Sequence, residues 1–218
     1  MRVPKTHHYN TSEKITKVHL DAPIVIPRLP VITNDRQRVK LVKTIETYIR
    51  SSLEYKDLIK YLKDYIDMNQ CQFWQNFDGH QKPGLIQIHH EPFDLFSITQ
   101  IVMNRQEQEL GYIDELQVAD EVMRLHYRGL VGLIPLSVTA HELVHDGKLI
   151  VPLNCVYGKF VQFVKEYYDY IDDVLILMLN DKIEQTKNLT AEDMSILSVR
   201  YIYTEVDGYR LPQIQQVN

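Results

Sequence analysis

The sequence predicts an α+β fold in which a small unit of two strands and one helix (ββα) lies within a mainly helical body. Three observations predict it. Several segments repeat apolar residues every three or four positions, which is helical spacing. Two short apolar runs, GLIQIHH and VGLIPL, are typical of strands, and the helical segment VTAHELVH follows the second run. At 218 residues the chain is long enough to bury a substantial core.

The N-terminal third is predicted to be an arm followed by a basic helical hairpin. Residues 1–33 carry β-branched residues interrupted by prolines, a pattern typical of an edge strand or arm. Asn34 or Asp35 can cap a first helix over 36–50, and a second helix follows over 55–68. The apolar positions of the two helices are Val39, Val42, Ile45 and Ile49, and then Leu58, Leu62, Tyr65 and Ile66. Residues 1–70 hold 13 Lys and Arg against 8 Asp and Glu, so this part is the expected non-specific DNA handle.

The rest of the chain alternates short strands and helices. We predict strands over 71–77, 84–90 and 131–136, and helices over 94–110 and 114–127. A short helix over 138–145 is capped by Ser137 or Thr139 and ends before Gly147. Residues 148–153 are expected to be extended, with helices over 157–170 and 172–187 and an ambiguous tail. The organisation is then an arm and hairpin (1–70), a core with a helical insertion at about 93–128 (71–160), and a helical region (161–218), packed as one compact unit.

Composition excludes several classes of protein. Two cysteines are too few for a disulfide framework or a cysteine-based zinc site. The N-terminus has no apolar signal region, and no run reaches the roughly 18 apolar residues that span a bilayer. We therefore expect no membrane partner and a cytoplasmic location. The net charge of −5 argues against a nucleic-acid binder that uses its whole surface.

Four of the nine histidines have a spacing that predicts a metal site. His141 and His145 are four residues apart on the predicted helix, so their rings project from one face. His89 and His90 are adjacent at the end of a predicted strand, just before Pro92. Three imidazoles with an exchangeable fourth position are typical of a catalytic metal site. Neighbours in a regular strand point to opposite faces, so His89 and His90 share a site only if the strand twists or ends there.

The segments IHHEPF and LVGLIPLSVTAHELVHDGKL resemble the HNH (His-Me finger, ββα-metal) endonucleases of tailed-phage genomes. The HH pair followed by H-x-x-x-H is similar to the arrangement in colicin-type DNases. The resemblance covers about residues 71–160. It implies a ββα-metal finger in which His89, His141 and His145 hold one divalent ion (Mg, Mn, Ni or Zn). It also implies that His90 is the general base.

These roles imply a metal-dependent endonuclease that hydrolyses DNA phosphodiester bonds. An imidazole suits removal of a proton from the attacking water, and the metal stabilises charge on the leaving oxygen. Two departures from the family pattern stand out. Gly132 occupies the position where the family usually has Asn or His, and about 50 residues separate the HH pair from His141. The second departure is explained by an inserted helical hairpin, whose entropic cost grows only logarithmically with length.

DNA is the expected partner, and the resemblance suggests a phage packaging or recombination protein as another. Four basic residues flank the site in sequence and are candidate phosphate contacts: Arg124, Arg128, Lys148 and Lys159. For a phage-encoded enzyme the expected location is the cytoplasm of the host cell. The oligomeric state does not follow from the sequence.

Two other hypotheses stay open. HELVH is also a zincin motif, in which His141 and His145 bind zinc, Glu142 is the base of a peptidase and Glu166 is a third ligand. That hypothesis leaves the His89–His90 pair unexplained. The third hypothesis is non-enzymatic: a metal braces a DNA- or protein-binding module, or an inactive remnant in a phage assembly.

Overall fold

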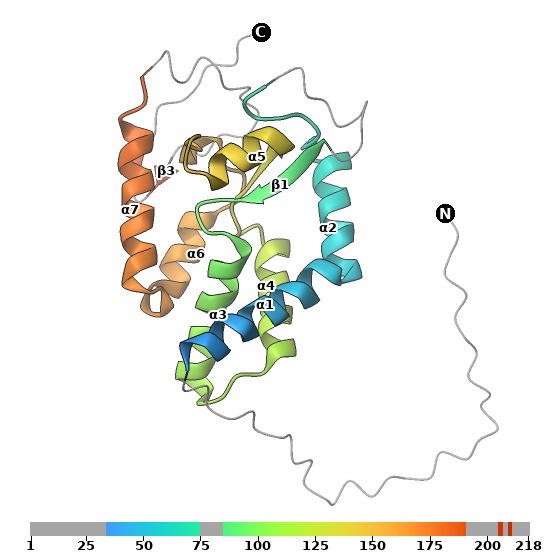
Figure 1. The fold of residues 1–218 in the computed structure, drawn as a ribbon, viewed down its shortest axis with the longest axis vertical. Helices are drawn as coiled ribbons and strands as arrows, with labels where there is room; N and C mark the ends of the chain where they lie inside the picture. The colour runs from blue at the N-terminus through green and yellow to red at the C-terminus, as the bar shows by residue number, and fades with distance from the viewer. Residues whose placement is uncertain (1–33, 75–84, 191–204, 207–208, 211–218) are drawn as a thin grey trace, which may run out of the picture.

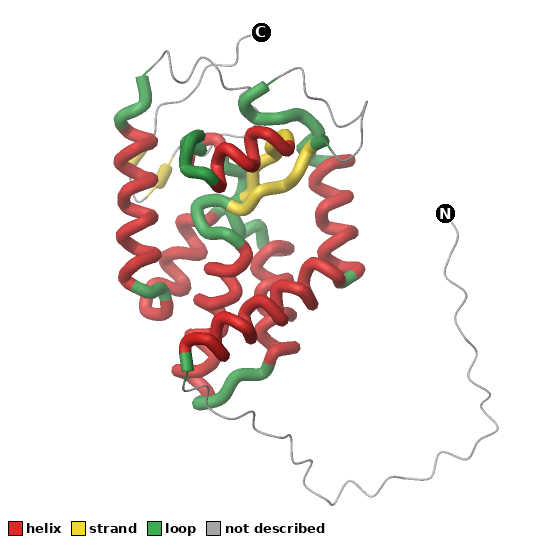
Figure 2. Tube along the Cα trace, viewed as in Figure 1, coloured by secondary structure: helices red, strands yellow, loops and turns green. Residues whose placement is uncertain are grey.

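The computed structural model describes residues 34–74, 85–190, 205–206 and 209–210. Over these residues the fold is mainly helical α+β, as predicted, with seven α-helices and two small antiparallel sheets. Figures 1 and 2 show β1 and α5 at one end of the molecule and α1, α3 and α4 gathered at the other. The predicted arm over 1–33 and most of the tail lie outside the described residues. The three-part division of the chain stays a prediction.

The two helices of the predicted basic hairpin are present as α1 (Asp35–Ser51) and α2 (Leu53–Asp64), while their role as a basic DNA handle stays a prediction. The side chain of Asn34 accepts a hydrogen bond from the Arg36 N–H at 2.8 Å, which caps α1. Ser52 separates the helices, and its hydroxyl accepts from the Tyr55 N–H at 3.1 Å to cap α2. An asparagine cap therefore sets the start of α1, and a serine cap sets the start of α2.

The apolar stripes of this hairpin are confirmed except at their ends. The buried residues are Val42, Ile45, Ile49, Tyr55, Leu58 and Leu62. Val39 is 44% exposed and Tyr65 is 78% exposed, contrary to the prediction. Val39 lies in the first turns of α1, and α2 ends at Asp64, so neither position faces the helices that cover the stripe.

The predicted insertion forms α3 (Leu95–Leu110) and α4 (Glu115–Tyr127), which pack against each other and against α1. Asp94 and Asp114 cap the two helices through their carboxylates. Gly111 ends α3 in the left-handed conformation, with φ of 73°. The insertion thus contributes to the core of the molecule while separating the two strands of the sheet in sequence.

Strands β1 (Ile86–His90) and β2 (Leu133–Ser137) pair antiparallel, from Ile86 opposite Ser137 to His90 opposite Leu133. Helix α5 (Val138–His145) follows β2 directly and contacts both strands. The strand predicted over 71–77 is not present in its described part, 71–74. There the Gln72 N–H donates to the Pro135 carbonyl at 2.9 Å. Proline has no N–H to donate in return, so the ladder does not extend.

The C-terminal part contains α6 (Phe160–Tyr167) and α7 (Asp173–Lys187), close to the two predicted helices. The 3-10 turns η1 (Leu153–Cys155) and η2 (Tyr168–Tyr170) precede them. The segment expected to be extended over 148–153 is a loop that leads into η1. The second sheet pairs β3 (Glu205–Val206) with β4 (Tyr209–Arg210). None of the helices in the described ranges is long and apolar enough to cross a membrane.

Candidate metal centre

Helix α5 carries two of the candidate ligands and is held by few apolar contacts. Of its eight residues only Ala140 is buried, while Val144 is partly buried against the core. The Ser137 hydroxyl accepts from the Ala140 N–H at 3.3 Å and caps the first turn. A helix of two turns is not stable alone in water, so its position depends on its contacts with β1 and β2.

The structure brings His89, His141 and His145 together. One possible ligand atom from each residue lies within 4.8 Å of the others, and no second group of this kind occurs among the described residues. The Nε2 atoms of His141 and His145 are 3.3 Å apart. Two nitrogens bound to one tetrahedral zinc at about 2.0–2.1 Å are separated by roughly 3.3 Å. The helix pair therefore already has the spacing of two ligands of one ion.

The environment of His141 favours its neutral form. Burial, followed by the nearby His89 and His145 rings, lowers the pKa of His141 from 6.5 to about 4. The neutral ring is the form that binds a metal. A pocket of about 550 Å³ adjoins the three rings, and Arg50 and Lys63 line it as well. An ion bound here would be reached from this pocket.

His90 is turned to a different set of partners. Its Nε2 lies 3.0 Å from Nε2 of His126, and Nδ1 of His126 lies 2.7 Å from the Val122 carbonyl oxygen. The carbonyl can only accept, so Nδ1 of His126 donates to it and the Nε2–H of His90 donates to His126. Tyr55 stacks on His90 at 6.4 Å and meets His126 edge-on. Burial lowers the pKa of both histidines, to about 4 for His126.

Two residues beside the cluster, His126 and Glu91, were not predicted as site residues from the sequence. Both are buried beside the histidines, His126 against His90 and Glu91 against His89. The strand pattern could have predicted Glu91, because a residue two positions after His89 in a strand lies on the same face. No spacing signal links His126, in α4, to a strand 36 residues earlier.

Gly132 has a structural explanation. A Cβ at this position would lie 1.8 Å from the backbone oxygen of Glu91 and 2.9 Å from Cγ1 of Val156. The Glu91 N–H also donates to the Gly132 carbonyl at 3.0 Å, which extends the pairing of β1 and β2 by one bond. The chain therefore needs glycine here for close approach of two backbones.

Three of the four candidate phosphate contacts are paired with carboxylates. Arg124 contacts Asp120 at 2.8 Å and Glu121 at 3.2 Å, and Lys148 contacts Asp146 at 2.8 Å. Arg128 contacts Glu166 at 3.0 Å, so the third ligand of the peptidase hypothesis lies in an ion pair outside the histidine cluster. Lys159 is exposed before α6. DNA as a partner stays a prediction.

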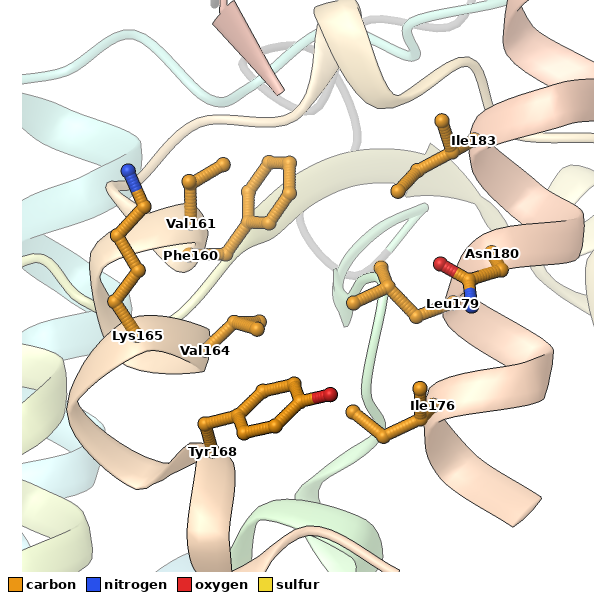
Figure 3. A pocket seen from close by; sticks show the side chains of 9 residues that line it. All are labelled: Phe160, Val161, Val164, Lys165, Tyr168, Ile176, Leu179, Asn180 and Ile183. Carbon is orange, nitrogen blue, oxygen red and sulfur yellow. The ribbon is translucent and has the colours of Figure 1, made fainter. Parts of the chain in front are cut away.

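A second hollow, of about 350 Å³, lies between α6 and α7. Figure 3 shows its side chains projecting from the two helices toward each other. The lining is mostly apolar: Phe160, Val161, Val164, Lys165, Tyr168, Ile176, Leu179, Asn180 and Ile183. It includes no histidine, cysteine or carboxylate, so it offers none of the usual side-chain ligands of a metal ion.

A protein-family model described as Bacteriophage G278-like virion protein matches residues 10–207. The matched range includes all seven described helices and all three residues of the histidine cluster. No curated protein and no solved structure matches the chain.

This match corrects the function expected from the sequence. The chain is matched as a virion protein, so the predictions of an HNH endonuclease, of an enzyme and of a cytoplasmic location are wrong. The peptidase alternative is overturned by the same finding, and of what was expected about function and origin only the phage origin is supported. The error has a physical reason. Histidines on a strand and a helix specify a geometry that can hold a metal, and that geometry does not specify the reaction. The role of His90 as a general base was implied only by the resemblance to nucleases.

Proposed function

The chain belongs to the Bacteriophage G278-like virion protein family, and we propose that it is a non-enzymatic component of the phage particle braced by one metal ion. In this proposal β1, β2 and α5 form a ββα-metal finger. The ligands are His89, His141 and His145, and the ion fixes α5 against the sheet. The family match supports the place in the particle, and the histidine geometry supports the ion.

The observation that carries the proposal is the meeting of His89 of β1 with His141 and His145 of α5, a helix with a single buried side chain. Such a helix gains little from the hydrophobic effect, whereas an ion shared with β1 would tie it to the core. Imidazole nitrogens favour zinc, nickel or copper, and magnesium favours oxygen. Of the four ions expected from the sequence, zinc and nickel suit these ligands, and we take zinc as the native ion.

The free energy of metal binding can be a substantial fraction of the free energy of unfolding of a domain. An ion present at about 100 times its dissociation constant stabilises the folded state by about 2.7 kcal/mol, if it binds only that state. Small domains are stable by only about 5–15 kcal/mol. The ion would therefore change the thermal midpoint of the whole protein measurably.

Calorimetric titration of chelator-treated protein with zinc tests the metal site. We expect one zinc per chain for the natural protein, and binding at least about tenfold weaker for His141→Ala. The matched control is Glu142→Gln, because Glu142 is exposed on the same helix and lies outside the cluster. Its binding should equal that of the natural protein. Natural protein that binds no zinc would overturn the proposal.

The place in the particle is tested separately, by mass spectrometry of phage particles purified on a density gradient. We expect the chain in a fixed ratio to the other particle proteins. A chain found only in the infected-cell lysate, and absent from particles, would contradict the structural role even if zinc binds.

A further inference from the structure

Glu91 is a buried carboxylate between a candidate metal ligand and a distant lysine. It follows β1 directly and is 2% exposed. Its Oε2 lies 3.4 Å from Nε2 of His89, while its Oε1 accepts a hydrogen bond from Nζ of Lys182 on α7. Lys182 is only partly buried, so the pair links the interior of the sheet to the outer helix.

Because Glu91 is buried, its carboxylate depends on the few groups that contact it. An ionised carboxylate that loses water needs a positive or hydrogen-bonding partner, and Glu91 has the Lys182 ammonium at Oε1. The His89 ring lies 3.4 Å from the other oxygen, Oε2, within reach of its Nε2. Glu91 itself does not belong to the group of ligand atoms formed by the three histidines, and it contacts the site through the His89 ring.

We propose that Glu91, held by Lys182, is a positioning residue that orients His89 for metal binding. Metal-binding histidines usually donate their other ring N–H to a carboxylate or a carbonyl, which fixes the tautomer and makes the ligand more basic. With Nε2 of His89 donating to Glu91, Nδ1 is the nitrogen that binds the ion. This inference rests on the proposed metal site and adds to it the residues that tune its affinity.

The arrangement also couples α7 to the metal. Lys182 lies on α7, about 90 positions after Glu91 in the sequence, and its ammonium holds the carboxylate that holds His89. An ion on His89 would favour the donating Nε2–H and so strengthen the bond to Glu91. By linkage, the Glu91–Lys182 pair should favour binding of the ion by the same factor.

The test is a cobalt titration followed by the visible absorption of the ion, on full-length natural protein and three variants. The variants are Glu91→Gln, the double variant Glu91→Gln/Lys182→Met, and the control Glu184→Gln. Glu184 is exposed on α7 and pairs with Lys187. We expect about 10–100-fold weaker cobalt binding for both Glu91 variants and no change for the control.

The double variant separates positioning from folding. Glu91→Gln leaves Lys182 without its carboxylate and should lower the thermal midpoint of the metal-free protein. Adding Lys182→Met removes the unpaired charge and should restore part of that midpoint, while cobalt binding stays weak. If affinity instead recovers together with the midpoint, Glu91 acts only on folding and the inference is wrong.

Failure of the two proposals can be told apart. Natural protein that binds no cobalt or zinc refutes the metal site itself. Natural protein that binds cobalt, with Glu91→Gln binding within about twofold, leaves the metal site intact and refutes the role of Glu91. Nitrogen NMR of histidine-labelled, zinc-loaded protein is an independent readout: zinc on Nδ1 of His89 supports the inference, and zinc on Nε2 overturns it.

Discussion

Acid should destabilise this protein through His126. The ring is 4% exposed, and burial lowers its pKa from 6.5 to about 4, partly opposed by the hydrogen bond to the Val122 carbonyl. The unfolded chain therefore binds a proton more readily than the folded one between these two values. The stabilising contribution is complete above pH 6.5 and is lost as the pH falls toward 4.

The size of this effect follows from the two pKa values. At about pH 5 the unfolded ring is almost fully protonated and the folded ring almost fully neutral, so the loss from His126 alone is about 2 kcal/mol. At still lower pH the loss approaches a limit of roughly 3 kcal/mol. His90, whose pKa is also lowered by burial, adds to the loss in the same direction.

Urea unfolding of the natural protein and of His126→Gln measures this contribution. The assay is run on metal-free protein at about pH 7.5 and about pH 5, and the quantity compared is the change in unfolding free energy between the two. We expect this change to be smaller in His126→Gln by about 2 kcal/mol, whatever the absolute stability of the variant. An equal change in both proteins would refute the argument, as would an NMR titration showing a folded pKa of 6 or above for His126.

Three further changes test the packing around the site. Gly132→Ala should cost about 1–3 kcal/mol in urea unfolding or prevent folding, because the new Cβ meets the Glu91 backbone oxygen; unchanged stability would contradict the close approach. Ser137→Ala should cost about 1 kcal/mol and weaken zinc binding in calorimetry, since it removes the cap of α5; unaltered affinity would show that α5 does not need this cap. Ile45→Ala should cost about 2–5 kcal/mol in the same unfolding assay, and Val39→Ala less than about 0.5 kcal/mol, because of these two residues only Ile45 is buried. Equal losses in the two variants would contradict the buried face of α1 that the structure shows.

Local signals in the sequence predicted most of the helices. The caps expected at Asn34 and Ser137 are present. Ser52, Asp94 and Asp114, which were not predicted as caps, start three further helices, and Gly111 ends α3 in the left-handed conformation. Such signals act over a few residues and need no knowledge of the fold. The strand expected over 71–77 was wrong in its described part, because a partner strand with proline at the contact cannot complete a ladder.

Part of the candidate site could be predicted from the sequence. Helical spacing places His141 and His145 on one face, and the structure has their nitrogens 3.3 Å apart. The adjacent His89 and His90 gave no means of choosing the ligand from the residues alone. That choice depends on α4, because His126 holds the Nε2 of His90. Lys182 could not be found from sequence, since its contact with Glu91 exists only in the folded chain.

The function was the least accessible property. A strand pair, a short helix and their histidines have the geometry of a metal site, and the same geometry is compatible with catalysis or with bracing. Gly132 was interpreted as a departure from a nuclease motif, whereas the structure shows a position where two backbones leave no room for a side chain. The family match places the chain among virion proteins, which the histidine pattern alone did not indicate.

X-ray absorption at the zinc edge of the zinc-loaded protein shows whether the three histidines hold an ion. We expect one zinc per chain with three imidazole nitrogens at about 2.0–2.1 Å and one further light atom. His141→Ala should lose this signal, while Glu142→Gln keeps it. A zinc surrounded by oxygen atoms alone, or a spectrum unchanged by His141→Ala, would contradict the proposed metal centre.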